Sequence, residues 1–153
     1  MTHEIILNWL QNLRSDVTIY PDAFFELRTQ EEMIRADENK SFFVYVEIKF
    51  DKIESTFSDE TAEKAFWENF LKCIAFKDRG SDVLGFLPER AGLGLLMLDS
   101  KMSGWTRLKG RIEEFCRRSL GDVSEILDTK VRAFVYPACL DDFSEIHKTT
   151  AQV

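Results

Sequence analysis

One segment, residues 79–99, constrains the fold of this chain more than any other. Its sequence, RGSDVLGFLPERAGLGLLMLD, divides into a charged turn from Arg79 to Asp82, a short apolar strand, a five-residue loop and a second strand. The second strand, 93–98, is apolar on both faces, which is typical of a strand inside a sheet. A loop as short as Pro88–Gly92 joins antiparallel neighbours. The segment therefore predicts a hairpin with one strand buried on both sides.

The other periodic segments predict helices and strands around this hairpin. Apolar residues at helical spacing predict helices over 4–13, from about 21 to 37, from 59 to 77 and from 105 to 119. Alternating β-branched and aromatic residues predict strands over 41–50 and 131–136, and residues 51–58 read as a polar connection. The second helix has an expected apolar side of Phe24, Phe25, Leu27, Met33 and Ile34.

The order of these elements is α, α, β, α, β, β, α, β. Without the first helix it is a split β-α-β unit with a hairpin between its helices. We therefore expect an α+β fold, an antiparallel sheet covered on one face by helices, in the ferredoxin-like palm architecture.

Composition limits the classes of function. The chain has 153 residues, 44% hydrophobic residues and a net charge of −7, so it can bury one core and does not suit nucleic-acid binding. The amino terminus lacks a basic region followed by a long apolar run, and no segment is long and apolar enough for a membrane span. Cys73, Cys116 and Cys139 form no Cys-x-x-Cys pair and favour buried thiols in a reducing compartment. We expect a cytoplasmic protein.

Several short motifs in this order resemble a GGDEF domain, the nucleotidyl-cyclase fold that makes cyclic di-GMP. Glu32, Arg35 and Ala36 match the pattern that ends the helix before the family's first strand, and Arg79-Gly-Ser-Asp82 matches its Arg-x-x-Asp turn. The resemblance covers roughly residues 20–137. It implies an amino-terminal helix and connection over 1–19, a GGDEF-like domain over 20–140 and a polar tail over 141–153.

The resemblance also implies that the family's reaction is lost. Where active members carry magnesium-binding carboxylates on the first strand, this chain has Glu47-Ile48-Lys49, and a lysine beside a metal opposes its binding. The Gly-Gly-Asp-Glu-Phe loop is replaced by Pro88–Gly92, which lacks the paired glycines and the acids that phosphoryl transfer uses there. We expect no catalytic residues and no cofactor, with Glu47 as the one weak candidate for a metal ligand.

The resemblance gives Arg79 and Asp82 two interpretations. In the family this turn is the inhibitory site for cyclic di-GMP, where the arginine grips phosphate or a guanine edge and the aspartate accepts from guanine. Alternatively, the two side chains form a local pair that closes a helix-to-strand turn.

Three functions follow. The first is an inactive GGDEF-like module with a regulatory or protein-interaction role in bacterial signalling, which binds a protein partner or pairs with itself. The second is a cyclic di-GMP receptor that uses Arg79 and Asp82. The third is a residual nucleotide-binding or cyclase-like enzyme that uses Glu47.

Overall fold

The computed structural model describes residues 2–13, 17–77 and 82–137. It contains a five-stranded sheet in the order β1-β3-β4-β2-β5. The strands are β1 (Ile19–Tyr20), β2 (Phe43–Lys49), β3 (Val83–Phe86), β4 (Gly92–Leu98) and β5 (Val131–Tyr136). β1 runs parallel to β3, and every other pairing is antiparallel. The predicted α+β architecture and the hairpin of β3 and β4 are confirmed, with β4 buried along its whole length.

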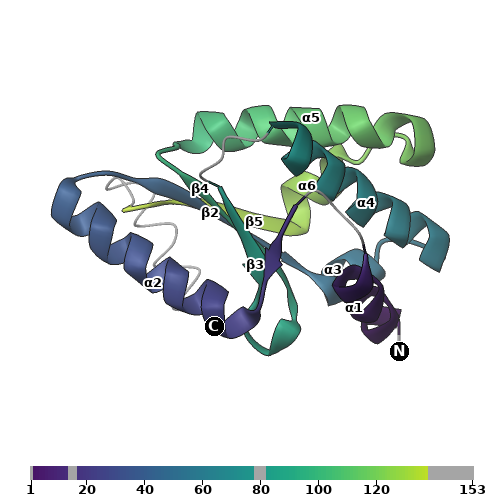
Figure 1. Ribbon diagram of the computed structural model, residues 1–153. Coiled ribbons are helices and arrows are strands. Elements are labelled where there is room, and N and C mark those ends of the chain that lie inside the picture. Colours follow the sequence, from purple (N-terminus) through teal and green to yellow (C-terminus); the bar gives the residue numbers. More distant parts are fainter. Residues whose placement is uncertain (1, 14–16, 78–81, 138–153) are drawn as a thin grey trace.

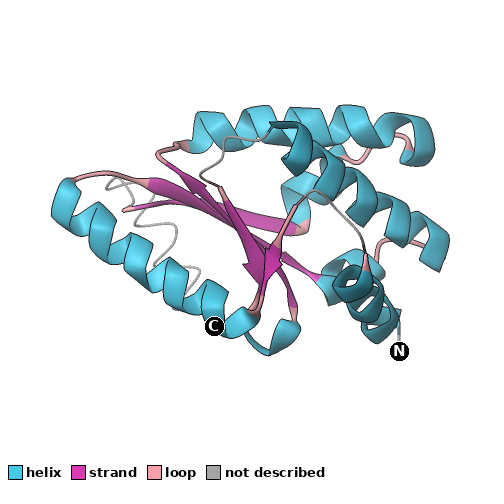
Figure 2. Cartoon of the chain, in the orientation of Figure 1, coloured by secondary structure: helices cyan, strands magenta, loops and turns pink. Residues whose placement is uncertain are grey.

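Helices lie on both faces of this sheet (Figures 1 and 2). One face carries α4 (Glu60–Lys77), α5 (Met102–Leu120) and the short α6 (Ser124–Thr129), with α1 (Thr2–Asn12) and α3 (Phe50–Glu54) at one end. The opposite face carries α2 (Asp22–Asn39) alone. The expectation that helices cover only one face was therefore wrong, because α2 packs on the second face through its own small core.

The larger core lies between the sheet and α4 and α5. Val44, Val46 and Ile48 of β2 point into it, as the strand alternation predicted. Aromatic rings fill the end near α3, where Trp67 meets Phe50 edge-on at a centroid distance of 5.2 Å. The amino-terminal helix belongs to the same core, since Ile6 and Leu10 are 0% and 3% exposed.

Two short elements were not predicted. Residues 51–58 were expected to be a polar connection, but α3 begins at Phe50, directly after β2, and buries Phe50 and Ile53. A helix of five residues is too short to show an apolar period in sequence. β1 was missed for the same reason, because it has only two residues. It pairs with β3 and forms the one parallel pairing among the described strands.

The expected apolar side of α2 was also wrong. The helix buries Phe25, Glu32 and Ala36, while Phe24, Leu27, Met33 and Ile34 are 46%, 54%, 37% and 58% exposed. The cause is a cross-strand pair of glycines beneath the helix. Gly85 of β3 lies opposite Gly94 of β4, and a Cβ on Gly94 would come within 2.5 Å of the Phe25 ring. The ring of Phe25 therefore holds α2 on the sheet, while Phe24, Leu27 and Ile34 remain exposed.

This contact predicts the effect of Gly94→Ala. The added methyl group would overlap the Phe25 ring, so we expect a loss of about 1–3 kcal/mol in the free energy of unfolding, measured with urea. The loss should be smaller in a Phe25→Leu background, which removes the outer ring atoms.

Gly110→Ala is the matched control, because nothing lies within 4 Å of a Cβ at that position in α5. It should stabilise the protein by roughly 0.5–1 kcal/mol through helix propensity. Equal effects of the two substitutions would contradict the proposed role of the Phe25 contact.

Candidate functional site

The hairpin between β3 and β4 ends in a 3-10 turn, η1 (Pro88–Arg90). Glu89 and Arg90 both adopt left-handed backbone conformations, with φ of 60° and 54°. The backbone N–H of Leu87 donates to the Gly92 carbonyl over 2.9 Å and closes the turn. The loop has the predicted five residues but lies one residue earlier than expected, at 87–91, because Gly92 is the first residue of β4. Two non-glycine residues carry its strain.

Gly92, the glycine that follows the turn, is required for close packing against β2. A Cβ on Gly92 would lie 2.1 Å from the carbonyl oxygen of Ile48, so the hairpin backbone touches β2 directly. Next to it, the N–H of Phe50 donates to the Ala91 carbonyl over 2.9 Å and joins the hairpin to the start of α3. Gly92 therefore permits strand packing.

Glu47 and Lys49 lie on the same face of β2, the face toward α2. Glu47 pairs with Gly94 on one side and with Arg132 of β5 on the other, and Lys49 pairs with Gly92. Burial, together with the nearby Glu47 carboxylate, raises the pKa of Tyr45 above its usual range, so the phenol keeps its proton and donates to Glu47 Oε2 over 3.2 Å. The carboxylate of Glu47 is thus engaged within the sheet.

A magnesium site at Glu47 would need oxygen ligands beyond its own carboxylate. A magnesium ion on a protein is usually held by one or two carboxylates together with phosphate oxygens. Here the described part of the chain brings no three His, Cys, Asp or Glu side chains into a group that could hold a metal ion. Glu47 instead lines a groove of about 280 Å³ between α2, β2 and β5, together with Arg132.

Arg79 lies outside the described residues, so its contact with Asp82 stays a prediction. Asp82 is half-buried and stands immediately before β3.

Cys73 and Cys116 are buried, as predicted, and burial beside Cys73 raises the pKa of the Cys116 thiol to about 12. A thiol with so high a pKa is unreactive at neutral pH. Cys139 also lies outside the described residues.

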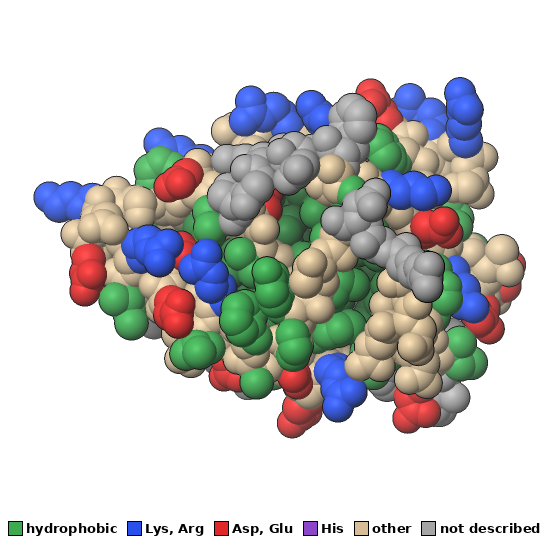
Figure 3. All heavy atoms as spheres, viewed as in Figure 1, with side chains coloured by type: hydrophobic (Ala, Val, Ile, Leu, Met, Phe, Trp, Pro, Cys, Tyr) green, Lys and Arg blue, Asp and Glu red, His purple; other side chains and the backbone are tan. Residues whose placement is uncertain are grey.

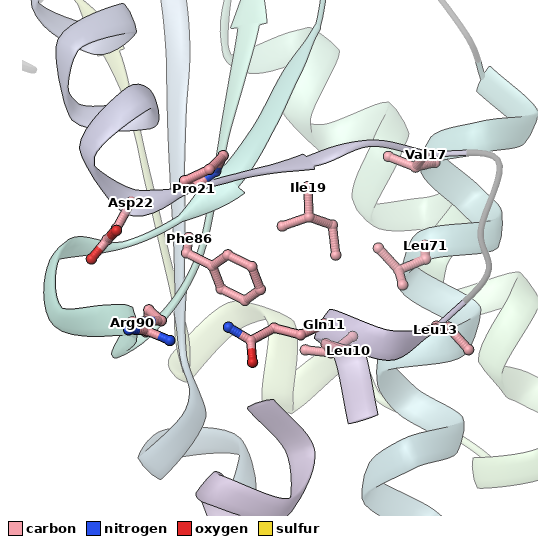
Figure 4. Close-up of a pocket in the computed structure, with 10 residues that line it drawn as sticks. All are labelled: Leu10, Gln11, Leu13, Val17, Ile19, Pro21, Asp22, Leu71, Phe86 and Arg90. Atoms are coloured by element: carbon pink, nitrogen blue, oxygen red, sulfur yellow. The ribbon is translucent and has the colours of Figure 1, made fainter. Parts of the chain in front are cut away.

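A second cavity opens at the edge strand β1, beside η1 (Figure 4). It measures about 430 Å³ and is lined by Leu10, Gln11, Leu13, Val17, Ile19, Pro21, Asp22, Leu71, Phe86 and Arg90. Its floor is apolar, and Gln11, Asp22 and Arg90 bring polar groups to it. Such a lining suits a small organic molecule or a partner's side chain. This cavity could not be predicted from the sequence, because its walls come from α1, β1, α2, α4, β3 and η1.

Sequence reasoning also missed an acid in the core. Glu63, in the first turn of α4, is 1% exposed, and its Oε2 atom has no hydrogen-bond partner among the described residues. Burial, reinforced by Glu54 and Glu60, raises the pKa of Glu63 from 4.5 to about 7. Trp67, one turn further along the helix, likewise buries an Nε1 atom with no partner among them.

Three comparisons place the chain among known proteins. No protein-family model matches it, and no curated protein sequence does. Solved structures do match: a DGC protein from Thermotoga maritima has a TM-score of 0.56 at 13% identity, over 89% of this chain and 93% of that one. The GGDEF domain of YfiN (TpbB) from Pseudomonas aeruginosa has a TM-score of 0.53 at 18% identity, over 89% and 92%.

A third structure is the diguanylate cyclase SiaD from Pseudomonas aeruginosa, in complex with its activator SiaC. It matches at a TM-score of 0.51 and 13% identity, over 99% of this chain and 60% of the neighbour. At these identities the likeness establishes the fold: the chain has the GGDEF-like nucleotidyl-cyclase palm. None of the helices in residues 2–13, 17–77 and 82–137 is long and apolar enough to cross a membrane.

The buried Glu63 predicts a pH dependence of stability. Because its folded-state pKa is raised above the unfolded value, the folded state binds more protons, and stability falls as pH rises from 4.5 to 7. Glu63→Gln should remove up to roughly 3 kcal/mol of this fall. Urea unfolding at intervals across that pH range measures it, and parallel curves for the two proteins would contradict the assignment.

Proposed function

We propose that this chain is a GGDEF-like module without cyclase activity that serves regulation by binding another protein. The observation that carries the proposal is the hairpin turn. Its one glycine, Gly92, is packed against the Ile48 carbonyl, and the remaining positions are Pro88, Glu89, Arg90 and Ala91. A side chain at each of these four positions hinders the close backbone approach that a bound phosphate needs.

The environment of Glu47 supports the same proposal. The carboxylate accepts a hydrogen bond from Tyr45, and its neighbours in the pairing are a glycine and Arg132. Lys49 adds a positive charge two residues further along the same face of β2. Two cations beside one carboxylate disfavour a divalent metal ion, and phosphoryl transfer in this fold depends on such ions.

Protein binding is the role that a scaffold without this chemistry can still perform. The neighbour SiaD, which shares the fold, is found in complex with an activator protein. The apolar side chains exposed on α2 give the present chain a surface for such a contact.

The first test is direct. The purified chain, incubated with GTP and Mg²⁺ or Mn²⁺, should yield no cyclic di-GMP by mass spectrometry, because the hairpin and β2 lack the phosphate and metal contacts. Product that forms with the native chain and disappears with Glu47→Gln would refute the proposal and favour the residual-enzyme hypothesis.

The cyclic di-GMP receptor hypothesis has its own test, since Arg79 and Asp82 keep the family's spacing from the loop. Under this hypothesis, isothermal titration with cyclic di-GMP gives heat with the native chain, and Arg79→Ala weakens the affinity at least about tenfold. Heat that is absent, or that is unchanged in the variant, removes this hypothesis and leaves the protein-binding role in place.

A further inference from the structure

The outer side of α2 carries a continuous stripe of five residues, Phe24, Leu27, Glu31, Ile34 and Glu38, which we call the α2 stripe. Their spacing places them on one side of the helix, away from Phe25, Glu32 and Ala36, which are buried against the sheet. All five are exposed, and the three apolar members are 46%, 54% and 58% exposed. Figure 3 shows hydrophobic, acidic and basic side chains together along α2 at the surface.

The fold does not need these apolar side chains. Phe25 already holds the helix on Gly85 and Gly94. Phe24 stacks on Tyr20, with ring centroids 4.6 Å apart. Three apolar residues in line on one exposed helix face form a patch of the kind that binds another helix.

The two glutamates of the stripe define the charge of its partner. The arginines closest to them, Arg28 and Arg35, both pair with the buried Glu32. Within the described residues, neither Glu31 nor Glu38 takes part in an ion pair. The stripe therefore presents an apolar row interrupted by two exposed carboxylates that form no ion pair among the described residues.

Neither α2 nor α5 of a second copy complements this surface. α2 holds six acidic side chains and two arginines, so two copies of α2 laid together would set like charges side by side. α5 has a basic outer face with Arg107, Arg117 and Arg118, but its apolar residues, among them Trp105 and Leu108, are buried in the core. Neither helix offers basic and apolar side chains together.

We propose that the α2 stripe is the docking surface for an amphipathic helix of a partner protein, one whose apolar positions are flanked by lysine or arginine. Apolar side chains of that helix pack on Phe24, Leu27 and Ile34, and its cations pair with Glu31 and Glu38. The stripe spans roughly 20 Å, the length of about four helical turns. This inference gives a place and a partner chemistry to the protein-binding role proposed above, and it rests on that role.

The test uses two labelled synthetic peptides, each about 20 residues long and hydrocarbon-stapled so that the helix is formed before binding. Both repeat leucine at the spacing of the stripe; one has lysine beside the leucines and the other has glutamate. Fluorescence anisotropy with the full chain should show binding of the lysine peptide and at least about tenfold weaker binding of the glutamate peptide.

Variants distinguish docking on the α2 stripe from general attraction of a basic peptide to this acidic chain. Glu31→Lys with Glu38→Lys should reverse the preference between the peptides. Glu114→Lys with Glu125→Lys changes the net charge equally at exposed sites on α5 and α6, across the sheet, and should keep it. Leu27→Ser with Ile34→Ser should weaken binding of the lysine peptide about tenfold or more. Both side chains are exposed, so Tm should fall only by the few degrees that the lower helix propensity of serine costs.

Three results would overturn the docking surface: no binding of the lysine peptide, equal losses in the two charge-reversed proteins, or a dimer that the Leu27→Ser and Ile34→Ser protein no longer forms. The last result would assign the stripe to a second copy. None of them bears on the absence of cyclase activity, which the GTP assay measures on the same preparation.

Discussion

The contact of Phe25 with the glycine pair of β3 and β4 determines how the two faces of the sheet differ. Gly85 and Gly94 lie opposite each other on β3 and β4, and because neither has a side chain, the sheet surface is hollowed there. The Phe25 ring fills that recess and holds α2 close to the sheet. Because the contact is narrow, it buries one ring, Ala36 and the Glu32 carboxylate, whereas the opposite face is covered by several helices around a continuous core.

Close backbone packing recurs at the hairpin. Gly92 lets the turn lie against the Ile48 carbonyl, and the Ala91 carbonyl then accepts a hydrogen bond from Phe50. Through Phe50 this contact reaches the aromatic cluster with Trp67 and so the core that α1 also enters. The hairpin, the end of β2 and the helices at that end therefore form one packed unit.

Long periodic elements could be predicted from sequence, since their burial follows a single period. β2, β4 and α5 bury the residues that the alternation and the helical spacing indicated. The face of α2 could not be predicted, because it depends on two glycines some sixty residues away that meet only in the folded sheet. The cavity at β1 could not be predicted for the same reason, because its walls come from distant segments. Glu63 was missed because an acid in the first turn of a helix is ordinarily exposed to solvent.

The two outer helix faces also differ in what the fold asks of them. On α5 the amphipathic pattern is fully used, since its apolar residues are buried and its charged residues meet solvent. On α2, three large apolar side chains, Phe24, Leu27 and Ile34, stay exposed beside the buried Phe25. Polar residues at positions 27 and 34 would leave the Phe25 contact intact. Folding therefore does not account for an apolar row on α2. Its regular spacing and the glutamates within it are what the helix contact proposed above requires.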